Sequence, residues 1–163
     1  MALTKPLTGI LPVAPTPFHA DGRVDEEGMC RVIDVMIDQG VDAICILANY
    51  SEQFVLSDEE RAQLTRISLE HAAGRVPVIV TVSHFSTAIA TERAKYAQDL
   101  GASMVMMMPP YHGSGLFPAP QGIYEHFQAV SDAINIPIMV QDAPLSGVQL
   151  PVDLLVKMAK ELE

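Results

Sequence analysis

The chain has 163 residues, of which 49% are hydrophobic and 18% charged, a balance typical of a packed globular protein and not of a disordered one. Ten lysines and arginines against 20 aspartates and glutamates give a net charge of −10 at pH 7. Because that charge repels phosphate backbones and anionic membrane surfaces, it argues against nucleic acid and membranes as partners.

Short apolar runs alternate with longer amphipathic segments along the chain. Each run is too short for a helix, and together they cover residues 9–14, 43–48, 77–82, 103–108 and 136–140. After the first run, apolar residues recur at helical spacing, at Met29, Val32, Ile33, Met36 and Ile37. The pattern predicts five strand-then-helix units.

The expected helices carry start and stop signals. Ser57 followed by Glu60 forms a capping-box pattern, and Pro151 stands where a first helical turn tolerates proline. Glycines that can adopt a left-handed backbone follow three of the helical patterns, at Gly40, Gly74 and Gly101. The strands show no alternation of apolar and polar residues, which indicates a parallel sheet covered on both faces and therefore an α/β fold.

Two architectures repeat β/α units, the open doubly wound sheet and the eight-unit barrel. The turn after the first strand, residues 14–18, contains no Gly-x-Gly-x-x-Gly, which argues against a dinucleotide-binding sheet. A (β/α)8 barrel is the better prediction, although a complete one takes about 250 residues. We expect residues 1–163 to form a single, incomplete TIM-barrel domain with about the first five β/α units.

Polar side chains follow all five predicted strands. In parallel β/α folds the ligand site lies at the carboxyl ends of the strands. Those ends present hydroxyl, amide, imidazole and carboxylate groups, at Thr16, Asn49, Tyr50, Ser51, Glu52, Thr81, His84, Tyr111, His112, Gln141 and Asp142. Such groups suit proton transfer next to a carbonyl, with a tyrosine or histidine as acid and base.

Several of these residues also have a structural interpretation. Glu52 suits a solvated loop or a helix cap, and Asp142 a turn that binds its own backbone. Tyr111 suits aromatic stacking in a loop. A lone histidine is more often structural than catalytic, but His84 and His112 follow neighbouring strands, which favours a function.

Other signals bear on reactivity and location. Cys30 and Cys45 lack metal-ligand spacing and fit buried thiols of a reducing compartment. The first 17 residues lack the apolar core of a secretory signal, and no apolar run approaches the roughly 20 residues of a membrane span, so we expect a cytoplasmic protein. No lysine lies at a strand end, because the four fall in the tail or on helix surfaces, at Lys5, Lys95, Lys157 and Lys160.

An ordered series of short motifs runs through the whole chain: Pro15-Thr16-Pro17-Phe18, Gly40-Val41-Asp42-Ala43, Ser51-Glu52, Gly74-Arg75-Val76-Pro77, Pro110-Tyr111 and Ile136-Pro137-Ile138 with Pro144. The series resembles that of the dihydrodipicolinate synthase / N-acetylneuraminate lyase family. The resemblance implies a (β/α)8 barrel, commonly a tetramer, in which a lysine on the sixth strand forms a Schiff base with a 2-oxo acid. It implies no metal and no organic cofactor.

Departures from the family pattern point to one of its branches. In place of the usual Gly-Thr-Thr-Gly-Glu the chain has Ala48-Asn49-Tyr50-Ser51-Glu52, and in place of the usual fifth-strand tyrosine it has Gln141. Together with Ser83-His84 and Tyr111-His112, these residues resemble the branch that dehydrates 2-keto-3-deoxy-L-arabonate to 2-oxoglutarate semialdehyde in pentose breakdown.

The resemblance implies roles for the strand-end residues. His84 is the first candidate for proton transfer, with Tyr111 and His112 as further candidates. Gln141 is expected to hydrogen-bond a substrate hydroxyl or the intermediate. The carboxylate of the small 2-oxo acid is expected near a helix N-terminus, held by residues among Thr16, Asn49, Tyr50 and Ser51.

The Schiff-base lysine is expected beyond Glu163, so this chain alone is expected to be inactive. Three alternatives stay open. One is a non-catalytic, truncated half-barrel that self-associates through its open edge. Another is a synthase-like aldolase of the same family. The third is a lyase whose metal is held by groups such as Glu52, His84, His112 and Asp142, which no spacing motif supports.

Overall fold

The computed structural model describes residues 7–111 and 117–162, and its centre is a parallel four-stranded sheet. The strands follow one another in chain order across the sheet: β1 (Ile44–Ile46), β2 (Val78–Thr81), β3 (Met104–Met107) and β4 (Ile138–Val140). Each lies inside one of the predicted apolar runs. The α/β class and the order of the units are therefore confirmed.

The first predicted strand, residues 9–14, is reduced to a single parallel bridge between Val13 and Cys45. The amide of Cys45 donates to the carbonyl of Pro12, and the amide of Ala14 donates to the carbonyl of Cys45. Proline has no N–H group, so Pro12 and Pro15 cannot extend the ladder as donors. The segment still occupies the place of a first strand beside β1.

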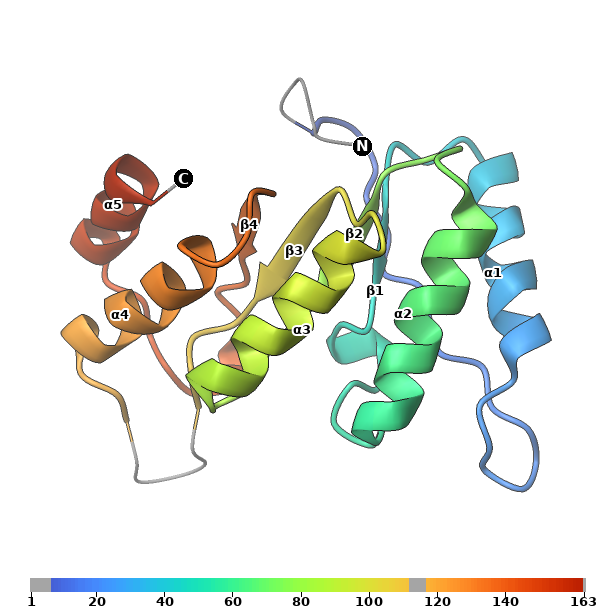
Figure 1. Ribbon diagram of the computed structural model, residues 1–163, viewed down its shortest axis with the longest axis horizontal. Helices are drawn as coiled ribbons and strands as arrows, with labels where there is room; N and C mark the ends of the chain where they lie inside the picture. Colours follow the sequence, from blue (N-terminus) through green and yellow to red (C-terminus); the bar gives the residue numbers. More distant parts are fainter. Residues whose placement is uncertain (1–6, 112–116, 163) are drawn as a thin grey trace.

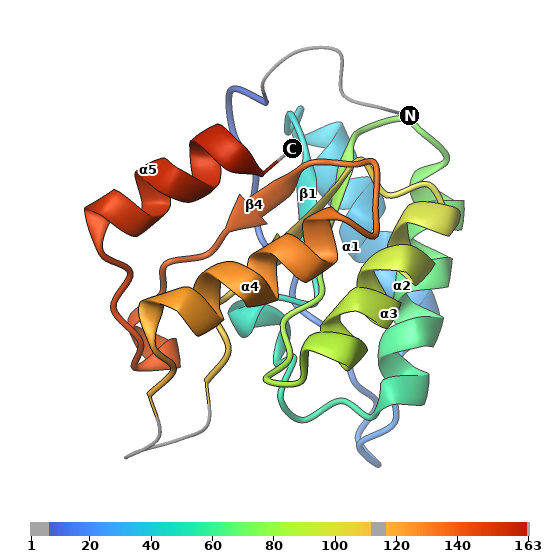
Figure 2. The same cartoon turned by 60° about the vertical axis from the view of Figure 1, so that its left-hand side comes forward.

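Within the described residues five helices alternate with the strands, and Figures 1 and 2 show them following one another in chain order around the sheet. In Figure 1, α1 and α2 stand side by side, α3 crosses in front of β2 and β3, and α4 and α5 lie at the β4 end. Their bounds are α1 (Glu26–Asp38), α2 (Asp58–Ala72), α3 (Thr87–Asp99), α4 (Pro120–Ser131) and α5 (Val152–Glu161), with single turns η1 (Asn49–Ser51) and η2 (Pro144–Ser146).

The predicted helix signals are confirmed in detail. The Ser57 hydroxyl accepts from the Glu60 amide at 3.2 Å, and the Glu60 carboxylate accepts from the Ser57 amide at 2.8 Å, which closes the capping box of α2. All three predicted glycine stops have a left-handed backbone, with φ of +76°, +72° and +91° at Gly40, Gly74 and Gly101. Pro151 is the N-cap of α5, one residue before its first turn.

Apolar side chains fill both faces of the sheet. The larger cluster lies between strands and helices and includes Ile44, Val80 and Met107, whereas a smaller cluster on the opposite face includes Cys45 and Ile79. The same burial explains why the strand sequences do not alternate. Both cysteines are free, and burial raises the pKa of the Cys45 thiol to about 11.

The sheet ends on an open side at β4. Within the described ranges β4 pairs with β3 alone, and all three of its residues are half-buried. Beside it lies a groove of about 400 Å³ between α4 and α5, lined by apolar side chains that include Phe127, Ile138 and Met158. No helix in residues 7–111 or 117–162 is long and apolar enough to cross a membrane.

The capping box of α2 gives a first test of this packing. We expect Ser57→Ala to lower the free energy of unfolding by about 1 kcal/mol, because the Glu60 amide loses its acceptor. Urea unfolding followed by circular dichroism measures the change. The exposed Thr8→Ala should leave the midpoint unchanged, and an unaltered midpoint in Ser57→Ala would show that the cap contributes nothing.

Candidate active site at the carboxyl ends of the strands

The loop after β1 has a strained backbone. Leu47 and Glu52 both have φ of +58°, in the left-handed region, which is unfavourable for residues other than glycine. Leu47 is also 3% exposed, so its conformation is fixed by packing. Strain of this kind costs of order 1–3 kcal/mol per residue and clusters at functional sites. The two strained positions flank the turn η1, which carries three of the predicted substrate-binding residues.

Hydroxyl groups tie this loop to the N-terminal segment. Thr16 Oγ1 donates to the carbonyl of Ser51 at 2.7 Å, and Ser51 Oγ donates to the carbonyl of Ala14 at 2.6 Å. Ser51 Oγ also accepts from the amide of Ala48 at 3.1 Å. Thr16 and Ser51 thus lie together as predicted, but both hydroxyl protons are engaged with backbone carbonyls, so only their oxygen lone pairs face further partners.

Asn49 and Tyr50 are adjacent in sequence but differ in exposure. Asn49 Oδ1 accepts from Gln53 Nε2 at 2.6 Å, and its Nδ2 faces the sulfur of Met108, at the end of β3, at 3.9 Å. The side chain of Asn49 is therefore oriented from two sides. Tyr50 is 84% exposed and does not belong to this buried network.

A buried arginine that the sequence analysis missed joins two of the loops. Arg61 on α2 is 4% exposed, and it donates from Nη1 to the carbonyl of Gln53 at 3.2 Å and from Nη2 to the carbonyl of Thr81 at 2.8 Å. Burial lowers the pKa of its guanidinium to about 10, which leaves it charged at neutral pH. The available signal was its helical spacing from the buried Leu64 and Ser68.

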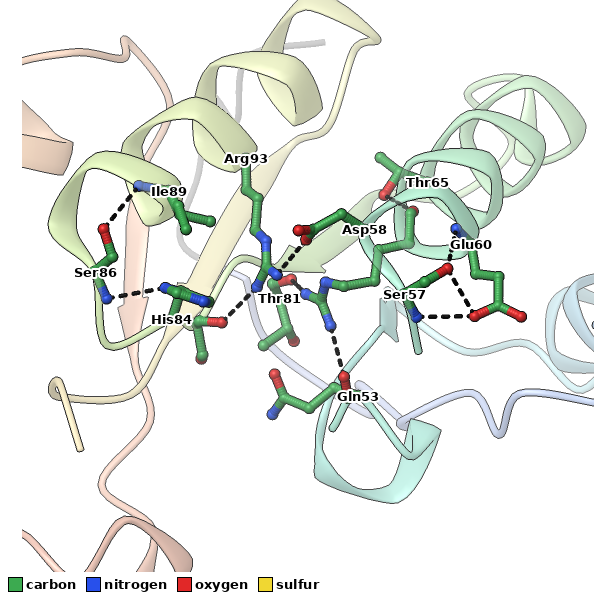
Figure 3. Close-up of polar contacts among 12 residues, drawn as sticks. Gln53, Ser57, Asp58, Glu60, Thr65, Thr81, His84, Ser86, Ile89 and Arg93 are labelled. Atoms are coloured by element: carbon green, nitrogen blue, oxygen red, sulfur yellow. Dashed lines mark hydrogen bonds and ion pairs between the residues drawn. The ribbon is translucent and has the colours of Figure 1, made fainter. Parts of the chain in front are cut away.

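A second arginine, Arg93 on α3, continues the network (Figure 3). Its Nη1 donates to the carbonyl of Ser83 at 2.8 Å, and its Nη2 donates to Asp58 at the start of α2 at 2.6 Å. Ser83 Oγ in turn accepts from the amide of Met108 at 3.0 Å. The ends of β2 and β3 and the helices α2 and α3 are thereby fixed to one another.

His84 follows directly after this anchored segment. Its Nδ1 accepts from the amide of Ser86 at 2.9 Å, and its ring stacks on Phe85 with 4.2 Å between the centroids. Because Nδ1 is the acceptor, the neutral ring carries its proton on Nε2. Burial, and after it the Arg93 cation, lowers the pKa of His84 below 6.5, against an opposing effect of Asp58. At pH 7 the side chain is therefore a neutral Nε2–H donor.

Tyr111 and Gln141 complete the described strand ends. Tyr111 packs edge-on against Phe54, with ring centroids 5.6 Å apart, and burial raises the pKa of its phenol, which stays protonated at neutral pH. The backbone N–H of Gln141 donates to the carbonyl of Met107. The side-chain oxygen Oε1 of Gln141 is buried and receives no hydrogen bond from any described residue. That oxygen is suited to accept from a hydroxyl group of a ligand.

Two further predicted positions, Glu52 and Asp142, lie apart from this network, and a third cannot be placed. His112 is outside the described residues. Glu52 and Asp142 are exposed, in agreement with their structural interpretation as loop residues. The described part of the chain contains no group of three histidine, cysteine, aspartate or glutamate side chains that could hold a metal ion.

Comparison with known proteins places the chain in a family. The sequence model of the dihydrodipicolinate synthetase family matches residues 6–163, so the chain belongs to that family. It is 56% identical over 156 residues to the L-2-keto-3-deoxyarabonate dehydratase of Azospirillum brasilense, covering 95% of this chain and 50% of that protein. It is 36% identical to the 4-hydroxy-tetrahydrodipicolinate synthase of Bartonella bacilliformis, covering 96% and 51%.

Solved structures agree with this assignment. The E. coli K12 prophage protein YagE, crystallised with pyruvate and described as a member of the dihydrodipicolinic acid synthase family, superposes with a TM-score of 0.90 at 30% identity. The match covers 95% of this chain and 51% of that one. The chain thus spans about half the length of the relatives it matches, and its fold is the corresponding part of a TIM barrel.

The electrostatics of His84 can be tested directly. We expect Arg93→Met to raise the pKa of His84, because a cation is removed and the Asp58 carboxylate loses its ion-pair partner. An NMR titration of the His84 ring protons measures the shift. Arg66→Met removes an exposed arginine that pairs with Glu70 on α2 and should leave the titration unchanged. A lowered pKa in Arg93→Met would contradict the arrangement.

Proposed function

We propose that this chain is the N-terminal half of a Schiff-base lyase that dehydrates 2-keto-3-deoxy-L-arabonate to 2-oxoglutarate semialdehyde. The observation that carries the proposal is the 56% identity to a dehydratase of that substrate, against 31–36% to the family's synthases. The relatives are about twice as long, and the imine-forming lysine is proposed to lie in a continuation beyond Glu163.

The positions of the lysines in the described residues support a nucleophile that lies elsewhere in the protein. Lys95 lies on α3, and Lys157 and Lys160 lie on α5, so none is at the carboxyl end of a strand. A Schiff-base mechanism needs a desolvated lysine in the site itself. The chain by itself is therefore proposed to contribute binding and positioning groups and no imine chemistry.

The proposed reaction removes one water in steps that balance. The lysine amine adds to the C2 carbonyl and releases water as the imine forms. Loss of a proton from C3 gives the enamine, which expels the C4 hydroxyl as water, the proton reaching that oxygen as the C4–O bond breaks. Loss of a proton from C5 then gives a conjugated dienamine that carries the enol of the aldehyde. Protonation at C3 restores the imine, and the enol gains a proton at C4 as its hydroxyl loses one to form the aldehyde. Hydrolysis of the imine consumes a water and returns the lysine.

His84 is proposed to act as a neutral hydrogen-bond donor in this sequence. Its Nδ1 accepts from the Ser86 amide, which leaves the Nε2–H group for the substrate. A donor aimed at developing negative charge stabilises the departing hydroxyl, as preorganised donors do in other enzymes. Tyr111, a protonated phenol at neutral pH, and His112 remain the candidates for proton transfer.

Gln141 and the turn η1 are proposed to hold the rest of the substrate. The unpaired Oε1 of Gln141 would accept from a substrate hydroxyl, and an amide there cannot act as a base. Asn49, held by Gln53, would donate to the carboxylate together with Tyr50, while Thr16 and Ser51, whose hydroxyl protons bind backbone carbonyls, would hold the turn in place. Burial of Thr16 and Ser51 beneath the turn supports a loop with a fixed shape.

Two alternatives make different predictions. A synthase-like aldolase would form the same imine but release no semialdehyde from the sugar acid. A self-associating half-barrel would cover the open β4 side and the apolar groove of about 400 Å³ with a second copy. A homo-oligomer, tetrameric as the resemblance implies, is proposed for the whole protein.

The direct test supplies 2-keto-3-deoxy-L-arabonate to the protein that includes the continuation and measures 2-oxoglutarate semialdehyde, with this chain alone in parallel. We expect product from the longer protein only. Formation of pyruvate and an aldehyde in place of the semialdehyde would establish the aldolase. The absence of any carbonyl product from both, with a stable oligomer of this chain, would establish the half-barrel.

Variants at His84 test the donor role. We expect His84→Ala to lower kcat by about 100-fold or more, the loss typical of a missing preorganised donor. His84→Gln, whose amide can still donate, should retain more activity than His84→Ala. Protonation of Nδ1 breaks its bond from the Ser86 amide and frees the ring, so we expect wild-type activity to fall toward acidic pH. Because the pKa of His84 is lowered, the fall is expected at a more acidic pH than for an ordinary histidine. Equal activity of both variants with wild type would exclude the role.

A further inference from the structure

We infer that Arg61 is a positioning residue: its guanidinium joins the β1–α2 loop to the end of β2, where the β2–α3 loop begins, and so holds Asn49 and His84 in the geometry that the reaction needs. The inference rests on the proposed function and deepens it. Arg61 belongs to no predicted set of site residues and lies on α2, behind the strand ends.

Arg61 carries a charge in a buried position, and burying a charge costs free energy. The side chain is 4% exposed. Its guanidinium donates hydrogen bonds to two backbone carbonyls and to no carboxylate of the described residues. Its Nε has no partner among the described residues. A buried charge with incomplete pairing is expensive, and an apolar side chain of similar volume is often as stable or more so. The bonds to the two carbonyls offset part of this cost, and what an apolar side chain cannot replace is the link that they make between two segments of the chain.

The two carbonyls that Arg61 binds belong to segments that lead to Asn49 and to His84. Gln53, whose carbonyl accepts from Nη1, orients Asn49 through its own side chain at 2.6 Å. Thr81, whose carbonyl accepts from Nη2, is the last residue of β2 and precedes His84 by three positions. One planar cation thus fixes both loops at once, which a single ammonium group cannot do with the same geometry.

The surroundings of Arg61 reinforce the bridge. Arg93 donates to the carbonyl of Ser83, between Thr81 and His84, and pairs with Asp58 (Figure 3). The β2–α3 loop is therefore held from α2 by Arg61 and from α3 by Arg93. Because Arg93 already binds the outer part of this loop, the contribution that Arg61 alone makes is the link between the two loops.

The experiment compares Arg61→Lys, Arg61→Met and the control Arg66→Met in the longer protein. Arg66 lies on the same helix but is exposed and pairs with Glu70. Lysine keeps the charge without the double bridge, and methionine keeps most of the volume. We expect kcat to fall about 10-fold to 100-fold in both Arg61 variants, as for a small misplacement of reacting groups, while Arg66→Met stays at the wild-type rate.

Two further readouts separate positioning from a loss of folding. All rates are taken well below the thermal midpoint of each variant, so that every protein is folded during the assay. Amide hydrogen exchange is measured on this chain, and we expect about 10-fold faster exchange at residues 49–54 and 82–85 in Arg61→Lys, with unchanged exchange in α4. Faster exchange everywhere would indicate general destabilisation and would overturn the inference.

Failure of the inference differs from failure of the proposed function. If wild-type protein makes no semialdehyde, the lyase assignment fails, and the exchange measurement still decides whether Arg61 couples the two loops. If wild type is active and the folded Arg61 variants keep kcat within 2-fold of it, the lyase stands and the positioning role is excluded. Loss of kcat together with local loosening of both loops supports the inference.

Discussion

Strands β1 to β4 pair in parallel and in chain order, and this pairing determines where every loop and helix of the described chain lies. It places the carboxyl ends of all four strands at one edge of the sheet, and each connection must then return through a helix on the outside. The predicted polar residues Asn49, His84, Tyr111 and Gln141 reach the same edge for this reason alone. Apolar clusters on both faces make that arrangement rigid.

Main-chain carbonyls and buried polar side chains then fix the loops at that edge. Thr16 and Ser51 tie the N-terminal segment to the loop after β1. Arg61 ties that loop to the end of β2, and Ser83 ties the start of the β2–α3 loop to the end of β3. Cross-links of this type satisfy backbone groups that would otherwise be buried without partners. The strained backbone at Leu47 persists within this framework.

Much of this fold could be predicted from the sequence, because the strands are continuous apolar runs and Ser57, Gly40 and Gly74 have strong local preferences. The first strand is shorter than predicted because Pro12 and Pro15 have no backbone N–H group to donate to a neighbouring strand. Helical spacing could place Arg61 on the buried face of α2, but its role could not be predicted, since its bonds go to backbone carbonyls 8 and 20 residues away, which no side-chain pattern reveals. The tautomer of His84 likewise depends on one backbone amide.

Under the proposed function, these strand ends form half of an imine-forming site whose nucleophile lies past Glu163. Borohydride reduction of the longer protein with 2-keto-3-deoxy-L-arabonate, followed by peptide mass mapping, tests it most directly. We expect one reduced adduct on a lysine beyond position 163 and none on Lys95, Lys157 or Lys160. An adduct on one of these three lysines, or turnover to the semialdehyde without any trapped adduct, would contradict it.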